Sequence, residues 1–551
     1  MRFRRIRLPL TIMLSVAFVA ATLLSPRSGL ASPAPSVSAQ AATMGEWSEP
    51  LSWPGIGIHT ALLPTGKVLM YSYPIGGPGS AAWLWDPGTG TMNAVPIDRN
   101  IFCSGQSFLP DGRLLVTGGK LAGTEGGTGI ADTHIFDPFT EEWTRVGDMA
   151  VARWYPTNVP LPDGETLVFA GMDEEGEATS LVERYDPISG MEVVPEVDLF
   201  LPTYPWMHVL PSGKVFDAGP QEMTGMFDPA TLSLEPVAPS NYGHRSAGTS
   251  VLLPLEPPDY RPNVLIFGGG EPATNTAEII DLGALDPTWG LTAPMTYARR
   301  NLNPVVLPDG KVLVVGGAAT GQEENPVLQA EIFDPVSETW TEVASMQRPR
   351  VYHSTAILLP DGRIVAAGSD GEFTAEIYSP PYLFQGPRPQ LSSAPPTVSY
   401  EASFSVSTPD AQDIEKVVLI SPAAVTHSVS MGQRYVALDF QAGTDLLTVQ
   451  APPNANLAPP GYYMLFAVNS EGVPSEATFV QLTAANVGAV GGIAELPRLD
   501  GGQADIAGAP LASDEALGSR FSFPAGAGAL AAGAATVTSV AAAWWIRRRL
   551  S

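Results

Sequence analysis

The sequence contains a single cysteine, Cys103, among its 551 residues. One thiol excludes an internal disulfide, and it excludes a zinc ribbon, because such sites need several cysteine ligands. Basic residues are also scarce, since 29 Lys and Arg stand against 56 Asp and Glu and give a formal net charge of −27. We therefore expect no nucleic-acid partner, because a phosphate backbone requires a basic surface.

Charged residues of either sign make up only 15% of the chain, whereas glycine and proline number 55 and 54. This composition argues against coiled coils and helix bundles, which are rich in charged residues and poor in turn formers. Hydrophobic residues still account for 44%, which argues against a disordered chain. The composition predicts an all-β protein in which many turns join short strands.

The two ends carry targeting signals. Arginines at positions 2, 4, 5 and 7 precede an uncharged run, which predicts a signal peptide or N-terminal anchor over residues 1–31. Residues 485–520 are rich in Gly, Ala and Asp and are expected to form a flexible stalk. A second uncharged run ends in three arginines and favours a transmembrane anchor over residues 521–549, the alternative being a low-complexity tail. These features predict an exported cell-surface protein held at the membrane by its C-terminal segment.

An internal repeat occupies most of the chain between these ends. Each copy begins with Leu-Pro, continues in most copies to Asp-Gly, and is followed by an apolar run. The starts fall 43 to 54 residues apart. The copies begin at Leu63, Leu109, Leu161, Leu210, Leu253 (a degenerate copy), Leu307 and Leu359.

Each copy has the features of a tight hairpin followed by a buried strand. Asp-Gly fits a short turn between two strands, and the apolar run that follows ends in Gly-Gly where backbones crowd. A Phe-Asp-Pro or Tyr-Asp-Pro motif recurs downstream and is expected to end an edge strand. A period near 50 residues is typical of kelch-type β-propellers, and a stack of sandwich domains would not repeat so regularly. Residues 44–385 are therefore predicted to form a seven-bladed kelch-type propeller.

The pattern changes in residues 386–484. This region lacks the repeat but keeps apolar strands, such as residues 416–420 and 462–468. About a hundred residues of this kind predict an immunoglobulin-like β-sandwich. The predicted fold class is thus all-β, with a seven-bladed propeller followed by a sandwich.

Several residues with redox or metal-binding chemistry precede the repeats. Cys103, Tyr155, Tyr352 and His353 lie ahead of their hairpins, and equivalent positions in a propeller converge on one end of its axis. We therefore expect these side chains to meet, although they span 250 residues. His427 lies in the sandwich region. Taken singly, each residue has an ordinary interpretation, such as a thiol that packs in a core.

The motifs around these residues occur in a fixed order along the chain. They are Phe-Cys-Ser-Gly at 102–105, Arg-Trp-Tyr at 153–155, Val-Tyr-His-Ser at 351–354, Tyr-Ser-Pro-Pro-Tyr at 378–382 and Val-Thr-His-Ser at 425–428. Together they resemble the copper radical oxidases, the family of galactose oxidase and glyoxal oxidase. The resemblance extends from residue 44 to about residue 484.

This resemblance implies one copper ion and a set of ligands. Tyr155 would be an equatorial phenolate joined to Cys103 by a thioether, and Tyr352 would be the axial phenolate. His353 and His427 would be the imidazole ligands, the latter delivered by a sandwich loop. Imidazole and anionic oxygen ligands suit Cu(II).

The implied reaction is the oxidation of an aldehyde or a primary alcohol. Copper changes by one electron and the reaction needs two, so a radical on the cross-linked Tyr155 would supply the second. Tyr352 would accept the substrate proton as general base. Dioxygen would reoxidise the site and leave as hydrogen peroxide. The implied partners are dioxygen and a small aldehyde or alcohol, or a cell-surface glycan.

The sequence departs from galactose oxidase around the cross-link. Trp154 precedes Tyr155, as in the glyoxal oxidase branch, where galactose oxidase has glycine. Trp154 or Trp206 could shield the radical, and the departures favour a small aldehyde, a hydroxy-carbonyl compound or a glycan end over free galactose. The other histidines match no ligand motif, although His208 and His244 could line the substrate cleft.

A second hypothesis is a non-catalytic kelch-type module that binds polysaccharide or acts in adhesion. Such a module needs aromatic and polar residues in a groove, but it has no use for the thiol, the two tyrosines and the two histidines together. The stalk and the anchor fit either hypothesis.

Overall fold

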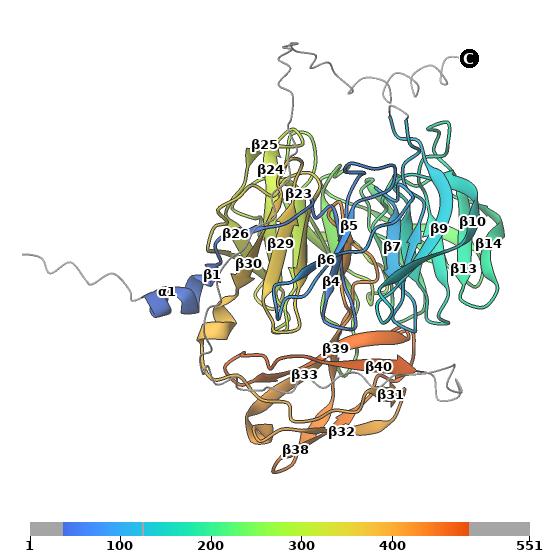
Figure 1. The fold of residues 1–551 in the computed structure, drawn as a ribbon. Helices are drawn as coiled ribbons and strands as arrows, with labels where there is room; N and C mark the ends of the chain where they lie inside the picture. The colour runs from blue at the N-terminus through green and yellow to red at the C-terminus, as the bar shows by residue number, and fades with distance from the viewer. Residues whose placement is uncertain (1–36, 124–125, 484–551) are drawn as a thin grey trace, which may run out of the picture. The chain divides into compact units, whose positions relative to one another are not determined.

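The computed structural model describes residues 37–123 and 126–483, all of which belong to one compact unit, Met1–Gly492. Within these residues strands predominate, and the helical elements are short: α1 (Val37–Met44), η1 (Pro381–Phe384) and η2 (Ala411–Asp413). The described strands form nine sheets, seven of which are the blades of a propeller and two of which form a sandwich (Figure 1). The predicted fold class, a propeller followed by an immunoglobulin-like sandwich, is confirmed.

The chain contributes four antiparallel strands to each of the first four blades, and the sheet of blade 1 is extended by two strands from the sandwich region. Blade 1 contains β3 (His59–Leu62), β4 (Val68–Tyr71), β5 (Ala82–Trp85) and β6 (Met92–Ala94), and blade 2 contains β7 (Gly105–Phe108), β8 (Leu114–Thr117), β9 (Ile130–Asp137) and β10 (Glu142–Arg153). Blade 3 contains β11 (Thr157–Pro160), β12 (Thr166–Phe169), β13 (Leu181–Asp186) and β14 (Gly190–Asp198), and blade 4 contains β15 (Met207–Val209), β16 (Val215–Asp217), β17 (Met223–Asp228) and β18 (Ser233–Pro239).

The last three blades follow the same plan, and the N-terminal strands complete the seventh. Blade 5 contains β19 (Thr249–Leu252), β20 (Asn263–Phe267), β21 (Ala277–Asp281) and β22 (Trp289–Thr292), and blade 6 contains β23 (Arg300–Val306), β24 (Val312–Thr320), β25 (Glu324–Pro326), β26 (Ala330–Asp334) and β27 (Thr339–Val343). Blade 7 contains β28 (Ser354–Leu358), β29 (Ile364–Gly368), β30 (Thr374–Ser379), β1 (Glu46–Trp47) and β2 (Leu51–Ser52). Because β1 and β2 pair with β30, the beginning of the propeller is hydrogen-bonded to its end.

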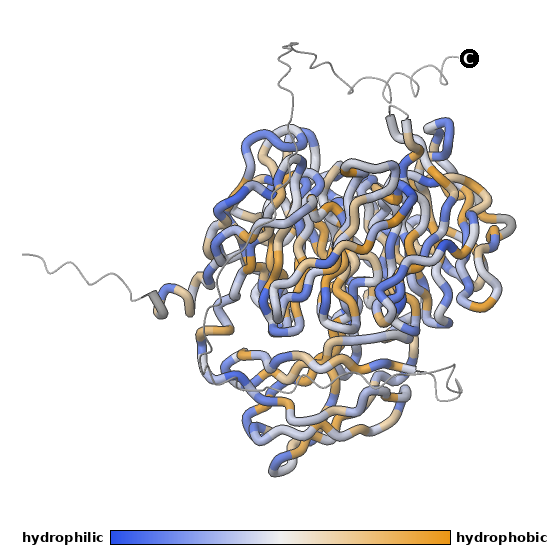
Figure 2. Tube along the Cα trace, viewed as in Figure 1, coloured by the Kyte–Doolittle hydropathy of each residue, from blue (hydrophilic) through white to orange (hydrophobic). Residues whose placement is uncertain are grey.

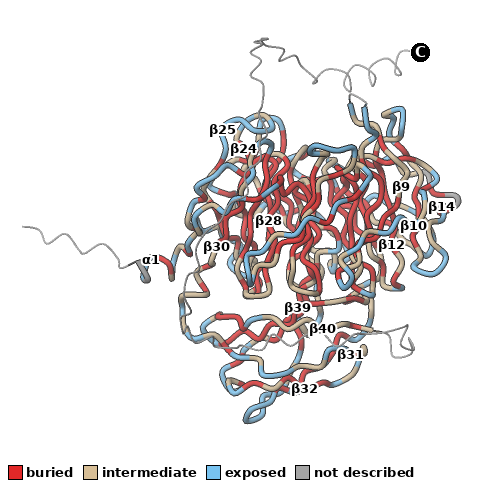
Figure 3. Tube along the Cα trace, in the orientation of Figure 1, coloured by how far each residue is buried: buried red, intermediate tan, exposed pale blue. Residues whose placement is uncertain are grey.

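The Leu-Pro repeats form the hairpins between the first and second strands of the blades, as predicted. At the second repeat the Leu109 amide donates to the Arg113 carbonyl at 2.8 Å, and Gly112 closes the turn at φ +86°. All residues of the following strand, β8, are buried. Buried, mostly hydrophobic strands run through the middle of the propeller (Figures 2 and 3).

The Gly-Gly pairs lie where one blade meets the loop that leads into the inner strand of the next, which we call the lead-in loop. A Cβ on Gly118 would stand 2.3 Å from the Arg153 carbonyl oxygen, and a Cβ on Gly316 would stand 2.2 Å from that of Arg350. Both distances are far below van der Waals contact, so any side chain would displace the loop. The glycines therefore allow the lead-in loops that carry Tyr155 and Tyr352 to pass close to the preceding blade.

The Asp-Pro motifs lie one strand further in than predicted. They end β9, β13, β17 and β26, which are the third strands of their blades, and a fourth strand pairs outside each of them. The Asp side chain stabilises the turn between the two strands. In blade 2, for example, Asp137 accepts a hydrogen bond from the Phe139 amide at 2.8 Å.

The sandwich packs a five-stranded sheet against a three-stranded sheet. The first contains β31 (Thr397–Ser399), β40 (Thr478–Thr483), β39 (Gly461–Asn469), β33 (Ile414–Ile420) and β36 (Tyr435–Leu438), and the second contains β32 (Ser403–Ser407), β38 (Leu446–Gln450) and β37 (Phe440–Ala442). Between β33 and β36 the chain leaves the sandwich as a hairpin of β34 (Ala424–Thr426) and β35 (Val429–Ser430). β34 pairs with β3, the inner strand of blade 1, so a sandwich loop enters the propeller.

Several expectations concern residues outside the described ranges. The signal peptide or anchor at 1–31, the stalk at 485–520 and the membrane anchor at 521–549 all lie there, so they remain predictions. The propeller limits 44–385 and sandwich limits 386–484 likewise remain predictions. Among the described residues, helices are too short or too polar to cross a bilayer.

Candidate metal centre

The lead-in loops of neighbouring blades are joined to one another by backbone hydrogen bonds. Tyr155 donates its amide to the Cys103 carbonyl at 2.9 Å, and Tyr204 donates its amide to the Tyr155 carbonyl at 2.9 Å. Further round the propeller, Asn301 donates to Ala247 at 2.7 Å. All five residues have left-handed backbones, with φ between 51° and 67°. We call this arrangement the lead-in ring, and its geometry brings side chains from different blades to one end of the axis.

Buried ion pairs fix four of the lead-in loops. In each pair an arginine ahead of the inner strand reaches a glutamate on the third strand of the same blade, and both side chains are at most 1% exposed. The arginines of blades 3 and 7 directly precede the tyrosine motifs. The pairs are Arg153–Glu183 (2.7 Å), Arg245–Glu278 (2.6 Å), Arg299–Glu331 (2.6 Å) and Arg350–Glu376 (3.1 Å).

The structure brings the five predicted site residues together. One ligand atom each from Cys103, His353 and His427 lies within 4.8 Å of the others, and His427 Nε2 is 3.6 Å from Cys103 Sγ. The hydroxyls of Tyr155 and Tyr352 are in direct contact. The His427 ring centre is 4.7 Å from that of Tyr155 and 4.8 Å from that of His353. One small space is therefore surrounded by a thiol, two phenols and two imidazoles.

His427 occupies the tip of the sandwich hairpin. His427 and Ser428 form its two-residue turn with φ of 47° and 68°, a conformation that usually requires Asn-Gly. Thr426 holds the hairpin in place, because its hydroxyl donates to the Ile58 carbonyl at 3.0 Å. The same hydroxyl lies 2.6 Å from His427 Nδ1, so Nε2 faces the centre.

His353 is oriented by a carboxylate that the sequence did not point to. Its Nδ1 lies 2.8 Å from Asp370 Oδ1, in the loop after β29. Its Nε2 is buried without a hydrogen-bond partner among the described residues. A carboxylate on Nδ1 selects the tautomer that leaves Nε2 as a lone-pair donor, as metal-ligating histidines commonly require. No motif marks Asp370, because it lies in an ordinary Ser-Asp-Gly turn.

Burial controls the protonation of this centre. Burial raises the pKa of Cys103 and that of Tyr155 well above their ordinary values, and it also raises the pKa of Tyr352. Burial and the neighbouring His353 lower the pKa of His427, so its imidazole is neutral. A bound cation reverses this preference for neutral thiol and phenol, because it stabilises the thiolate and phenolate forms. Two neutral imidazoles and two phenols are donors that fit one copper ion.

Aromatic rings cover Tyr155. The Trp154 ring stacks on it with centres 3.7 Å apart and planes 16° apart, and the Tyr204 ring lies 4.5 Å away at 26°. Of the two tryptophans considered from sequence, Trp154 is therefore the one in contact with the ring. Trp206 instead packs against Gly219 and Gly248. Sequence reasoning missed Tyr204, which belongs to no recognised motif.

A hollow of about 310 Å³ adjoins the centre. Its walls include Tyr73, Phe102, Asn100 and Lys120. Phe102 connects it to the centre, because its ring lies 5.3 Å from the His353 ring and 5.5 Å from the Tyr73 ring. Its described lining includes none of the five residues, so the hollow lies next to the centre rather than at it.

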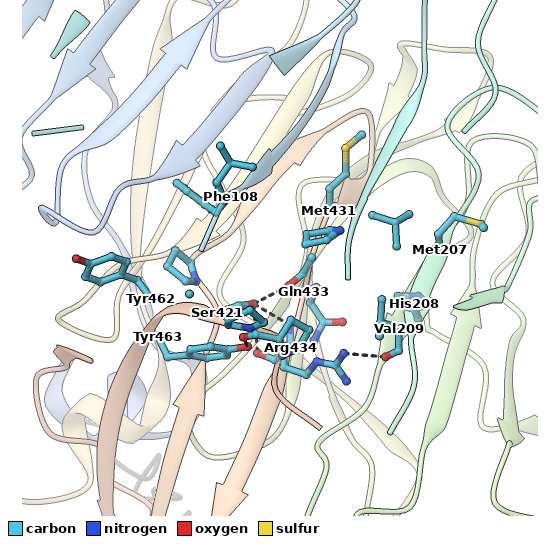
Figure 4. Close-up of a pocket in the computed structure, with 18 residues that line it drawn as sticks. Phe108, Met207, His208, Val209, Ser421, Met431, Gln433, Arg434, Tyr462 and Tyr463 are labelled. Carbon is cyan, nitrogen blue, oxygen red and sulfur yellow. Dashed lines mark hydrogen bonds between the residues drawn. The ribbon is translucent and has the colours of Figure 1, made fainter. Parts of the chain in front are cut away.

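The other histidines lie away from this space or behind it. His59 accepts a hydrogen bond from the Cys103 amide at 3.0 Å, and His134 is buried in β9. His208 lines a separate cavity of about 60 Å³ between propeller and sandwich, together with Arg434 (Figure 4). Burial lowers the pKa of His208 to about 3. His244 is exposed. Neither His208 nor His244 is one of the described residues that line the hollow beside the centre.

The propeller gathers these residues in one place, and an inserted sandwich hairpin supplies one of the histidines. This is the fold and site that the resemblance to the copper radical oxidases implies. Comparisons with known proteins agree. The model of the glyoxal oxidase N-terminus matches residues 80–382, and that of the galactose oxidase-like early set domain matches residues 388–482. The chain therefore belongs to the glyoxal oxidase and galactose oxidase family.

Individual relatives are similar over most of their length. The aldehyde oxidase GLOX of Vitis pseudoreticulata is 32% identical over 72% of this chain and 85% of its own. A galactose oxidase of Gibberella zeae is 28% identical over 80% of this chain and 71% of its own. A solved structure of a fungal alcohol oxidase of the AA5 family in complex with copper has a TM-score of 0.72 and 28% identity, and the match covers 80% of this chain and all of that one.

Proposed function

We propose that this protein is an extracellular copper radical oxidase that converts an aldehyde or a primary alcohol with dioxygen and releases hydrogen peroxide. The observation that carries the proposal is the convergence of the buried Nε2 of His353 and the imidazole of His427 with two phenols and a thiol. An alcohol would give RCH2OH + O2 → RCHO + H2O2. An aldehyde would react as its hydrate, giving RCHO + H2O + O2 → RCOOH + H2O2.

His353, His427, Tyr155 and Tyr352 would hold the metal. When bound, copper would supply one of the two oxidising equivalents and Lewis acidity at the reacting oxygen. Asp370 would keep the Nε2 lone pair of His353 directed at the site, since the two side chains lie 2.8 Å apart. Tyr352 would accept the proton of the substrate hydroxyl at its phenolate oxygen.

Cys103 and Tyr155 would form a thioether before the first turnover. The Cys103 S–H bond and a ring C–H bond next to the Tyr155 hydroxyl would be lost as a C–S bond forms, and dioxygen would take the two electrons and two protons as hydrogen peroxide. The cross-linked ring would supply the second oxidising equivalent. Trp154, stacked at 3.7 Å, would exclude water and reductants from that ring.

The surroundings favour a small aldehyde or a hydroxy-carbonyl compound, or the end of a cell-surface glycan. The hollow beside the centre is only about 310 Å³ and is partly walled by Tyr73 and Phe102. The residues at 1–31 and 521–549 support export and attachment to the membrane. Both inferences concern the setting and substrate rather than the chemistry, and they can be tested separately.

Mass spectrometry of the peptides containing Cys103 and Tyr155 tests the chemistry. Apoprotein loaded with copper in air should yield one linked peptide lighter by two hydrogens than the sum of its parts. Tyr155→Phe should bind copper yet yield separate peptides and no peroxide. If wild-type Cys103 stays alkylatable after copper loading and no aldehyde or alcohol in a panel produces peroxide, the proposal is wrong and a non-catalytic binding module becomes the better reading.

A further inference from the structure

Tyr204 contacts the face of Tyr155 that Trp154 leaves open. Trp154 stacks on Tyr155 at 3.7 Å, which fills one face, and Tyr204 lies 4.5 Å from the same ring at 26°. Tyr204 is only 5% exposed, and its ring centre is 5.0 Å from that of His427. The ring of Tyr204, which precedes blade 4, therefore packs against the ring of Tyr155, which precedes blade 3.

Tyr204 also binds both chain segments whose side chains must react. Its amide donates to the Tyr155 carbonyl at 2.9 Å, and its hydroxyl donates to the Ser104 carbonyl at 2.9 Å. The Tyr155 amide in turn donates to the Cys103 carbonyl at 2.9 Å. These three hydrogen bonds form a closed circuit that fixes the thiol segment relative to the phenol segment.

Tyr204 has an unfavourable backbone conformation at this position. Its backbone is left-handed, at φ 51°, a conformation that costs about 1–3 kcal/mol in a residue with a side chain. A position that keeps a bulky residue in that conformation is held by its surroundings, and here these include the two reacting segments.

We propose that Tyr204 is a positioning residue that aligns Cys103 with Tyr155 for thioether formation and supports the oxidised Tyr155 ring from below. The role rests on the proposed copper radical function. The hydroxyl and the ring have separable tasks. The hydroxyl holds Ser104 and therefore Cys103, whereas the ring packs face to face with the electron-poor ring that forms when Tyr155 loses an electron.

Two variants separate these tasks. Tyr204→Phe keeps the ring and loses the bond to Ser104, so copper-loaded apoprotein should form the thioether about fivefold more slowly, the effect of one hydrogen bond. The mature radical should then be as long-lived as in the wild type. Tyr204→Leu loses both contacts, so it should form the thioether more slowly still, and its phenoxyl absorption should decay about tenfold faster, the effect of one aromatic pair.

Tyr463 offers a matched control in the sandwich. It is 3% exposed, and its hydroxyl donates to the Pro459 carbonyl at 2.7 Å, so Tyr463→Phe and Tyr463→Leu remove a buried hydrogen bond and a buried ring outside the lead-in ring. The experiment uses the full chain, produced without copper, loaded with copper and exposed to air. Intact mass follows thioether formation, and optical absorption follows the radical.

The outcomes distinguish this role from the proposed function. If the wild type forms no thioether, both the proposed function and this role are refuted. If the wild type forms it and Tyr204→Phe matches it in rate while Tyr204→Leu matches it in radical lifetime, only the role of Tyr204 is refuted. Slowing in the Tyr463 variants to the same degree would also refute it, because the effect would then reflect general stability. If Tyr204→Leu does not fold, Tyr204→Phe alone decides.

Discussion

Loss of the Glu183 carboxylate should destabilise the protein strongly and slow the chemistry at Tyr155. Arg153 and Glu183 are both 0% exposed, and the glutamate accepts bonds from Arg153 Nη2 at 2.7 Å and Nε at 3.1 Å. Two further bonds from Arg153 reach the Ala170 and Leu181 carbonyls, so every nitrogen of the guanidinium donates at least one hydrogen bond. Removing its counter-charge leaves a cation buried in a medium that solvates it poorly.

The expected cost follows from that burial. Breaking a buried ion pair by removing one partner costs about 3–5 kcal/mol, whereas exposed pairs contribute about 0–1 kcal/mol. Glu183→Gln preserves the shape and should lie near 3 kcal/mol, the low end of that range, because the amide still accepts one bond. Arg153→Met combined with Glu183→Leu should recover part of the loss, since no charge then remains unpaired.

Glu331→Gln is the matched control for this prediction. The Arg299–Glu331 pair has the same 0% exposure and a 2.6 Å bond, but its lead-in loop carries none of the five centre residues. Urea unfolding of the apoproteins should therefore give similar losses for both variants. Only Glu183→Gln should also slow thioether formation, because Arg153 stands two residues before Tyr155.

Two results would refute this reasoning. If Glu183→Gln lowers the free energy of unfolding by less than about 1 kcal/mol, the Arg153–Glu183 pair contributes no more than an exposed ion pair and does not anchor the loop. Equal slowing of thioether formation in Glu183→Gln and Glu331→Gln would show that lost stability, rather than the local loop, controls the chemistry.

Three further predictions concern individual residues. Asp370→Ala should weaken copper binding by about 10–100-fold in a chelator competition, because His353 loses its orienting carboxylate; unchanged affinity would remove that role. Gly316→Ala should cost at least about 2 kcal/mol in urea unfolding, since its Cβ would stand 2.2 Å from the Arg350 carbonyl. Gly66→Ala, at φ +80° in open space, should cost only about 1 kcal/mol, and an equal cost would contradict the clash. Burial raises the pKa of Asp217 to about 7, so the folded state binds its proton more tightly than the unfolded state. Stability should therefore fall as pH rises from about 4 to about 7, by up to roughly 4 kcal/mol, and Asp217→Asn should flatten this slope in urea unfolding across that range; an unchanged slope would exclude Asp217 as its source.

Sequence reasoning could reach the blades because each repeats a local signal. The residues that determine a Leu-Pro-Asp-Gly turn and the apolar strand after it lie within about a dozen positions of one another. The structure forms a hairpin at each copy. The position of the Asp-Pro motif was misjudged because its turn looks the same whether the strand before it is third or fourth in the sheet. Two of the anchoring glutamates can be related to the motif in the sequence, since Glu183 and Glu331 each stand three residues before its Asp.

The contacts between blades could not be predicted from sequence. Whether Trp154 or Trp206 covers Tyr155, and that Tyr204 lies on its other face, depends on how the left-handed lead-in loops turn their side chains. Tyr155 and Tyr204 lead into the neighbouring blades 3 and 4, and their contact depends on how these two blades pack. Asp370 is likewise brought to His353 by the pairing of β28 with β29.

The sandwich hairpin links the centre to the assembly of the two parts of the fold. β34 pairs with β3 through His59–Thr426 and Ala61–Ala424. The backbone hydrogen bonds of this pairing fix the position of His427 at the centre. Without the sandwich the propeller would present Cys103 and its partners from blades 3 and 7, but β3 would expose an unpaired inner edge and the fifth residue would be missing. Because the last of the five residues arrives only with the docked sandwich, formation of the complete candidate centre requires that both parts have folded and packed together. The sandwich thus supplies part of the candidate metal centre, which gives a physical reason for the two to occur in one chain.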